Sequence, residues 1–138
     1  MTLPIYLLIP ALILLPIAAQ PVGCYGCVTT QDRQVTLFDA PLDFGTIGLL
    51  AHDYLAGAWY YEIQAGDTLA LIYPGSQVAY RVVDVQSVFP RRAQEPLVYS
   101  IKYTHGGLTL QTCNGKGFLF VHAELMDASS LSKLGEDT

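Results

Sequence analysis

Basic residues are scarce in this sequence. Lys and Arg together number seven in 138 residues, against twelve Asp and Glu, and the formal net charge is −5. Binding to a nucleic acid backbone needs a stripe of basic side chains that neutralises several phosphates, and so few cations do not provide one. The same shortage excludes a basic helix that lies on a membrane surface. We therefore expect no nucleic acid partner.

Charged residues are entirely absent before Asp32. Residues 3–19 form an apolar run about as long as a short membrane span, although three prolines weaken it as a helix. We interpret residues 1–23 as an export signal or a membrane anchor. The basic region that typically precedes the apolar part of a signal peptide is missing. A third interpretation takes PVGC at 21–24 as a lipid-attachment site, with the lipid on Cys24.

Only three cysteines are present, and export changes how they are interpreted. Cys24 and Cys27 lie in the stretch CYGC, within a predicted linker at residues 24–33. In an oxidising compartment they either pair with each other or remain free. The βαβ pattern that surrounds a thioredoxin-like redox motif is missing here. Cys113 is then the odd thiol, and it is either a buried structural residue or a reactive one.

Short segments rich in Val, Leu, Tyr and Thr run from residue 34 to 126, separated by Gly, Pro and Asp. So many strand-sized pieces in so short a span favour an all-β sandwich or closed barrel in one domain. Residues 52–60 have room for one turn of helix, and the polar residues 127–138 are predicted as a flexible tail. The eight predicted strands are 34–38, 47–52, 60–63, 68–73, 77–88, 97–103, 108–112 and 118–125.

Cys113 ends the alternating segment LTLQTC and is followed at once by Asn-Gly-Lys-Gly. It shares the more polar face of this strand with Thr109 and Gln111, so its sulfur is not simply core filling. A thiol nucleophile needs a neighbouring base, and the candidates are the three histidines His52, His105 and His122.

The three histidines differ in their place along the chain. His52 ends an apolar strand, as Cys113 does, and two strand ends can meet above a barrel. His105 lies in a predicted turn, and His122 within a strand is predicted to be a packed or exposed sheet residue. A transition-metal site made of Cys113 and histidines is the least favoured alternative, because no metal-ligand spacing such as His at i and i+4 is present.

Residues 34–125 resemble the catalytic domain of bacterial sortases, which are exported cysteine transpeptidases. The most specific match is LTLQTC, in which Thr109, Leu110, Thr112 and Cys113 correspond to the family's Thr-Leu-x-Thr-Cys motif. His52 lies about sixty residues earlier, and a Gly-Asp turn lies between. The resemblance implies an all-β fold, a sortase-like eight-stranded β-barrel, here preceded by the hydrophobic signal or anchor segment. It places the catalytic cysteine at the end of the seventh strand.

The resemblance also implies a reaction and its partners. Cys113 would attack the carbonyl of a Thr-Gly bond in the sorting motif of an exported protein, giving a thioacyl enzyme that an amine or water resolves. His52 would protonate the leaving amine and later deprotonate the incoming one. No cofactor is implied. The location implied is the bacterial cell surface, with the protein membrane-anchored and facing outward, or secreted.

One position departs from the family pattern. Sortases carry an arginine at the beginning of the last strand, and this place falls at Gly117. Lys116, or Arg91 and Arg92 in the long connection before the predicted strand 97–103, are candidates for stabilising the substrate and its oxyanion instead. The alternative function is a sortase-fold binding or structural module at the cell surface with impaired catalysis. Substrate choice is expected to depend on residues 88–107.

Overall fold

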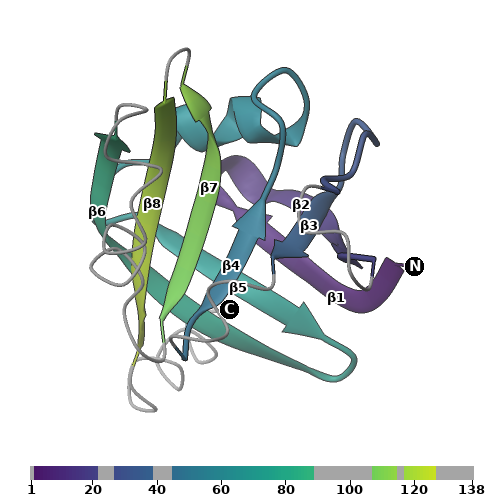
Figure 1. Ribbon diagram of the computed structural model, residues 1–138. Coiled ribbons are helices and arrows are strands. Elements are labelled where there is room, and N and C mark those ends of the chain that lie inside the picture. The colour runs from purple at the N-terminus through teal and green to yellow at the C-terminus, as the bar shows by residue number, and fades with distance from the viewer. Residues whose placement is uncertain (1, 22–26, 39–44, 89–106, 115–116, 127–138) are drawn as a thin grey trace.

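Eight strands close into a single barrel in the computed structural model of the chain (Figure 1). Around the barrel the order is β1-β2-β3-β4-β7-β8-β6-β5, and β1 pairs with β5 to close it. The structure describes residues 2–21, 27–38, 45–88, 107–114 and 117–126. The strands are β1 Thr2–Ile9, β2 Ile13–Ala19, β3 Val35–Phe38, β4 Ile47–Leu50, β5 Thr68–Tyr73, β6 Ser76–Val88, β7 Leu108–Asn114 and β8 Gly117–Leu125.

The sheet of the barrel is mixed, a detail that the predicted all-β class left open. β2 with β3 and β4 with β7 are parallel pairs, whereas the other neighbours are antiparallel. The predicted eight-stranded β-barrel is thus confirmed. Six of its strands lie where the sequence predicts them, from β3 to β8, and the other two do not.

The two unexpected strands come from the apolar run at residues 3–19. β1 and β2 form an antiparallel hairpin in which Leu7 lies opposite Leu15, and both side chains are fully buried. On its other side Leu7 pairs with Leu71 of β5. Residues 2–19 therefore contribute two strands to the barrel, and the predicted start of the barrel at residue 34 is wrong. Core burial by two strands accounts for the apolar composition that suggested a leader.

The break within this run is the turn between the two strands. Pro10 opens the short 3-10 helix η1 (Pro10–Leu12), where a proline lacking an N–H donor loses no helical hydrogen bond. Leu12 at this turn is 84% exposed. In the part of the chain that the structure describes, no helix has the length and apolar character needed to span a bilayer.

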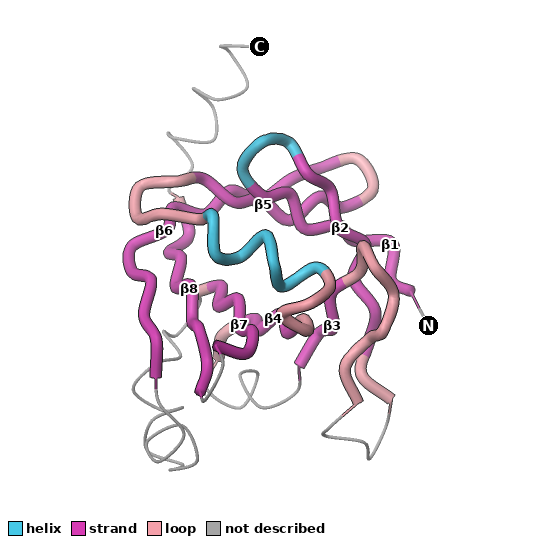
Figure 2. Tube along the Cα trace, turned by 90° about the horizontal axis from the view of Figure 1, so that it is seen from above, coloured by secondary structure: helices cyan, strands magenta, loops and turns pink. Residues whose placement is uncertain are grey.

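Residues 60–63 are also not a strand, contrary to the prediction. Residues 60–62 belong to the 3-10 helix η2 (Ala56–Glu62), which Figure 2 shows lying across one end of the barrel, and Ile63 caps its C-terminus. The buried positions of η2 are Ala56, Gly57 and Tyr60; the last two are three residues apart, and the buried Ile63 follows three residues later, which is the period of a 3-10 helix rather than of a strand. The predicted helical turn within 52–60 is therefore present. The predicted strand 97–103 lies outside the described residues.

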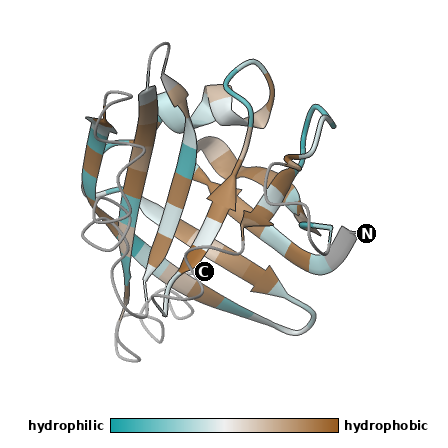
Figure 3. Ribbon diagram, viewed as in Figure 1, coloured by the Kyte–Doolittle hydropathy of each residue, from teal (hydrophilic) through white to brown (hydrophobic). Residues whose placement is uncertain are grey.

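The core fills the barrel from all of its strands and from η2. Tyr60 of η2 is fully buried, and its hydroxyl donates a hydrogen bond to the carbonyl oxygen of Leu49 at 3.2 Å. Burial raises the pKa of this phenol. Figure 3 shows alternating apolar and polar bands along the strands, as expected where successive side chains point to opposite faces. The largest fully buried side chains are Tyr60, Phe120, Leu7, Ile9, Leu15, Leu49, Leu69, Leu71, Leu108, Leu110, Val35 and Val82.

Candidate active site

Cys113 is the second-last residue of β7, beside the turn into β8. It lies opposite Phe118 of β8, and its side chain is partly exposed. Among the described cysteines it is the free thiol, because Cys27 is disulfide-bonded. Its pKa is raised, first by burial and then by the negative charge of Asp53. The resting sulfur is therefore held as the neutral thiol near neutral pH.

His52 follows the strand that runs parallel to β7. Leu50 of β4 lies opposite Gln111, and the N–H of Ala51 donates to the carbonyl of Gln111 at 3.1 Å. His52 comes next in the chain, so the backbone brings His52 and Cys113 to the same end of neighbouring strands. The imidazole stacks on Tyr54, with 5.1 Å between ring centroids and 23° between the planes.

The helix η2 begins four residues after His52, is hydrogen-bonded to its carbonyl and packs against β7. The carbonyl of His52 accepts hydrogen bonds from the N–H groups of Leu55 at 3.1 Å and Gly57 at 3.0 Å. A Cβ at Gly57 would lie 2.2 Å from Oγ1 of Thr112 and 2.6 Å from the carbonyl oxygen of His52. Only glycine fits at position 57, where η2 packs between Thr112 and the carbonyl of His52.

Tyr61 completes the contact between η2 and the end of β7. Its hydroxyl donates a hydrogen bond to the carbonyl oxygen of Cys113, while 47% of the side chain remains exposed. The pKa of this phenol is raised by burial and then by the negative charges of Asp53 and of Cys113. Asp53, Tyr61 and Cys113 are therefore electrostatically coupled at one end of the barrel. The sequence singled out neither Gly57 nor the contact of Tyr61, because only the fold brings them to β7.

The two threonines of the LTLQTC motif have different surroundings, although both are buried. Oγ1 of Thr109 lies 3.2 Å from Nδ1 of His122 on β8, and the two form a hydrogen bond. Among the residues that the structure describes, Oγ1 of Thr112 finds no hydrogen-bond partner. Leu110, between them, points into the core and is fully buried.

His122 is therefore a packed sheet residue. Its ring stacks on Phe120 with 5.9 Å between centroids, on the strand face opposite Leu119 and Val121. It lies opposite Thr109, four residues along β7 from Cys113, which is about 13 Å at the usual rise per residue. The structure does not bring His122 to the thiol.

The remaining residues predicted for the site, Lys116, Arg91, Arg92 and His105, lie outside the described residues. Gly117, where sortases carry their arginine, begins β8. The described guanidinium groups belong to Arg33 and Arg81, and that of Arg33 lies 5.4 Å from the ring centre of Trp59 in η2. Across the described stretches of the chain, no three His, Cys, Asp or Glu side chains gather as metal ligands would.

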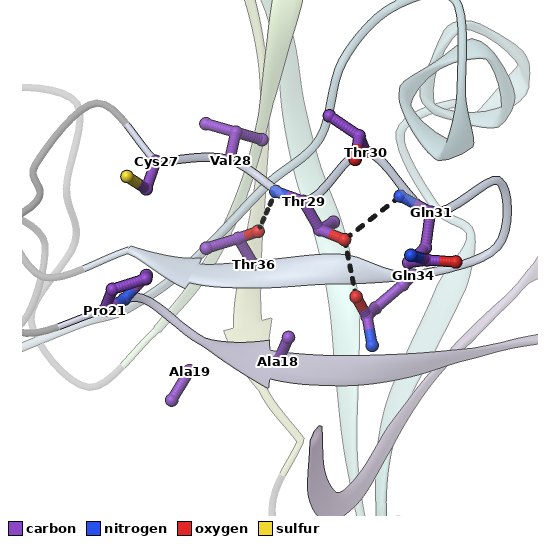
Figure 4. Close-up of a pocket in the computed structure, with 10 residues that line it drawn as sticks. All are labelled: Ala18, Ala19, Pro21, Cys27, Val28, Thr29, Thr30, Gln31, Gln34 and Thr36. Atoms are coloured by element: carbon purple, nitrogen blue, oxygen red, sulfur yellow. Dashed lines mark hydrogen bonds between the residues drawn. The ribbon is translucent and has the colours of Figure 1, made fainter. Parts of the chain in front are cut away.

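A separate cavity of about 280 Å³ lies beside the connection from β2 to β3 (Figure 4). Oγ1 of Thr29 donates to the side-chain oxygen of Gln34 at 2.5 Å, and Oγ1 of Thr36 accepts from the N–H of Thr29 at 2.8 Å. None of the predicted catalytic residues lines this cavity. Its walls are formed by Ala18, Ala19, Pro21, Cys27, Val28, Thr29, Thr30, Gln31, Gln34 and Thr36.

Among known proteins, solved structures of sortases resemble this barrel. No family model matches the sequence, and no curated protein matches it. Sortase C1 of Streptococcus agalactiae superposes with a TM-score of 0.65 at 20% identity, over 89% of this chain and 66% of that chain. Sortase A of Listeria monocytogenes gives 0.66 at 15% identity, over 90% of this chain and 87% of that one. The chain has the sortase fold.

A lid mutant of Corynebacterium diphtheriae sortase A is similar to the same extent, with a TM-score of 0.65 at 18% identity over 92% of this chain and 72% of that one. These shares exceed what residues 34–125 alone provide, so the likeness extends beyond the span predicted from sequence. At such identities the sortase fold is what the likeness shows. The chain spans 66% of the S. agalactiae sortase, somewhat less than two thirds of its length.

Proposed function

We propose that this sortase-fold protein is a cysteine transpeptidase or peptidase that cleaves a sorting motif through a thioacyl enzyme. The observation that carries the proposal is a free, partly exposed thiol at the end of β7, with His52 leaving the parallel strand β4 at the same end. A nucleophile and a general base on the ends of adjacent strands are two of the groups that covalent catalysis requires, and this supports the proposal.

The proposed reaction begins with the neutral thiol of Cys113. As Sγ attacks the carbonyl carbon of a Thr-Gly bond, His52 accepts the thiol proton and then gives it to the leaving amine. An incoming amine, or water, then attacks the thioacyl carbon, loses its proton to His52 and releases the thiolate, which is reprotonated. A base is required because burial and Asp53 keep the pKa of Cys113 raised and its thiolate scarce at neutral pH.

The oxyanion of each tetrahedral intermediate needs hydrogen-bond donors. With glycine at position 117, the candidates in this chain are Lys116, Arg91 and Arg92. Loss of one oxyanion donor costs other enzymes about 2.7–4 kcal/mol of transition-state stabilisation. We expect turnover to be slow unless one of these cations serves the same purpose.

The proposed substrate is an exported protein with a C-terminal sorting motif, and the proposed place of action is the bacterial cell surface. The disulfide at Cys27 supports a location outside the reducing cytoplasm. The sequence left open whether the cysteines of CYGC are disulfide-bonded or free, and Cys27 is disulfide-bonded. Cys24 lies outside the described residues.

A second candidate function is a sortase-fold binding module without catalysis. Two observations favour it: Gly117 stands where sortases carry an arginine, and the pKa of the Cys113 thiol is raised rather than lowered. Such a module would bind the sorting motif in the same place and release it unchanged.

The test is cleavage of peptides that contain a sorting motif with a Thr-Gly bond, followed by mass spectrometry, with and without an added amine acceptor. We expect cleaved and amine-linked products from the native protein and none from Cys113→Ala or His52→Ala. Binding without cleavage by native protein and Cys113→Ala alike would favour the second function. Equal cleavage by native protein and Cys113→Ala would contradict both proposed functions.

A further inference from the structure

We propose that Tyr61 is a positioning residue for Cys113, because its hydroxyl holds the end of β7 where β4 no longer reaches. This inference rests on the proposed role of Cys113 as nucleophile. It concerns a contact between residues 52 positions apart in the chain, made by a side chain of η2 that is half exposed.

The edge of β7 that faces β4 explains why such a contact is needed. The N–H of Ile47 donates to the carbonyl of Gly107 at 3.0 Å, and the N–H of Ala51 donates to the carbonyl of Gln111 at 3.1 Å. Alternate carbonyls of a strand point to the same edge, so the carbonyl of Cys113 also points toward β4. The chain leaves this edge at Ala51, one step too early to supply a donor.

The hydroxyl of Tyr61 supplies the missing donor. Its bond to the carbonyl oxygen of Cys113 continues the ladder by one rung after the backbone of β4 has turned away into η2. On its other edge the end of β7 pairs with the start of β8, where Cys113 lies opposite Phe118. Tyr61 is thus the described contact that ties the nucleophile's backbone to the side of the barrel that carries His52.

Gly57 makes this rung geometrically possible. Because a Cβ here would overlap Oγ1 of Thr112 and the carbonyl of His52, the missing side chain lets η2 lie directly on the strand end. Four residues further on, Tyr61 then reaches the carbonyl of Cys113. The same short helix therefore contacts His52 through its first turn and Cys113 through its last, and it sets the two proposed catalytic residues relative to each other.

The consequence is for rate rather than for substrate binding. Nucleophilic attack requires the sulfur within about 3–3.5 Å of the carbonyl carbon on the correct line, and a misplacement of about 1 Å can cost 10²-fold in rate. A strand end held on one edge only would sample positions away from that line. We expect loss of the Tyr61 hydroxyl to lower kcat and to leave KM nearly unchanged.

The experiment compares Tyr61→Phe with Tyr6→Phe, which removes a phenol hydroxyl from an exposed strand residue of β1. Amide hydrogen exchange is followed by mass spectrometry in the peptide that spans the end of β7 and the start of β8. In Tyr61→Phe we expect exchange there to be about fivefold faster, the effect of one lost hydrogen bond, and kcat to fall about tenfold with KM within twofold. Tyr6→Phe should match the native protein in both.

Equal exchange at the end of β7 in Tyr61→Phe, Tyr6→Phe and native protein would overturn the inference. If the native protein turns over peptide, faster exchange in Tyr61→Phe with an unchanged kcat would also overturn it. If the native protein cleaves no peptide but Tyr61→Phe alone exchanges faster, the proposed function fails, whereas the holding of β7 by Tyr61 is supported. Gly57→Ala is the second variant: by pushing η2 off Thr112 it should reproduce the faster exchange of Tyr61→Phe.

Discussion

The hairpins β1–β2 and β7–β8 are both antiparallel, but the more apolar of the two, β1–β2, is the less completely buried. β1–β2 is apolar on both faces, yet one face is buried and the other is partly exposed, with Tyr6 and Leu14 exposed to 38% and 42%. In β7–β8, polar residues alternate with leucines along β7, yet both faces are buried, including Thr109 and His122. Buried polar groups must find partners, so β7–β8 is the more strictly specified hairpin.

The difference separates stability from chemistry. β1–β2 contributes apolar area to the core and closes the barrel against β5. β7–β8 contributes core on one face and a hydrogen-bonded, partly polar arrangement on the other, ending at the free thiol of Cys113. Substitutions in β1–β2 should therefore affect folding alone, and those at the end of β7 should affect reactivity.

Removal of residues 1–19 should have the largest effect. If these residues were a leader, the shortened chain would fold as before, but the structure assigns two of eight barrel strands to them. Without β1 and β2 the barrel cannot close, and β3 and β5 each lose one of their two partner strands, so we expect an unfolded chain. Circular dichroism with thermal melting makes the measurement. A cooperative melt of the shortened chain close to that of the full chain would contradict the assignment.

Truncation of a core leucine in the same hairpin comes next. Leu7→Ala removes a fully buried side chain and should lower the free energy of unfolding by about 2–5 kcal/mol. Leu14→Ala, on the exposed face of the same hairpin, is the control and should cost about 0.5 kcal/mol. Urea unfolding of both variants checks this. Equal losses would mean that the two faces of the hairpin are not distinguished as the structure has them.

Replacing each motif threonine by valine compares two buried hydroxyls on one strand. Thr109→Val leaves Nδ1 of His122 without this hydrogen bond and should lower the free energy of unfolding by about 1–3 kcal/mol. Thr112→Val removes a hydroxyl that makes no hydrogen bond and should be neutral or slightly stabilising. Urea unfolding again decides, and a larger loss for Thr112→Val would contradict the contacts described for the strand.

A smaller effect is expected on the pH dependence of thiol reactivity. The pKa of Cys113 is raised by burial and by Asp53, so its thiolate forms at higher pH than in an ordinary cysteine, and alkylation should rise on the alkaline side. Asp53→Asn removes one negative charge, which lowers the pKa, so alkylation at pH 8 should be faster. The rate of iodoacetamide modification from pH 6 to 10 measures it. A profile shifted to higher pH by Asp53→Asn would have the wrong sign.

Periodicity was sufficient for six strands and failed for the other two. β3 to β8 are short strand-like segments bounded by turn residues, whereas residues 3–19 are apolar on both faces of a strand. Hydropathy cannot distinguish a hairpin of this composition from a membrane span. The signal for a hairpin was Pro10 in the middle of the run, where η1 now forms the turn. Residues 60–63 were mistaken for a strand because they include the strand-favouring residues Tyr60, Tyr61 and Ile63, and the segment is too short for a helical period to show.

The place of Cys113 at a strand end followed from sequence, but its neighbours did not. Strand parity put Cys113 with Thr109 and Gln111, and the turn residues after it marked the end of β7. The packing of Gly57 on Thr112, the nearby charge of Asp53 and the hydrogen bond of Tyr61 arise because β4 runs parallel to β7 and leads into η2 at the same end. Local sequence pattern does not reveal which strands distant in the chain pair with each other. The aromatic residues of η2 gave no sign that one of them would hold a carbonyl.

The most direct test of the central claim is the intact mass of the protein during reaction with a sorting-motif peptide, with the modified residue located by peptide sequencing. Native protein should gain the mass of the acyl fragment ending in threonine, bound to Cys113 and released by an added amine. His52→Ala should gain none. Peptide cleavage with Cys113 unmodified at every time point, or an acyl group on any other residue, would contradict the assignment of Cys113 as the nucleophile.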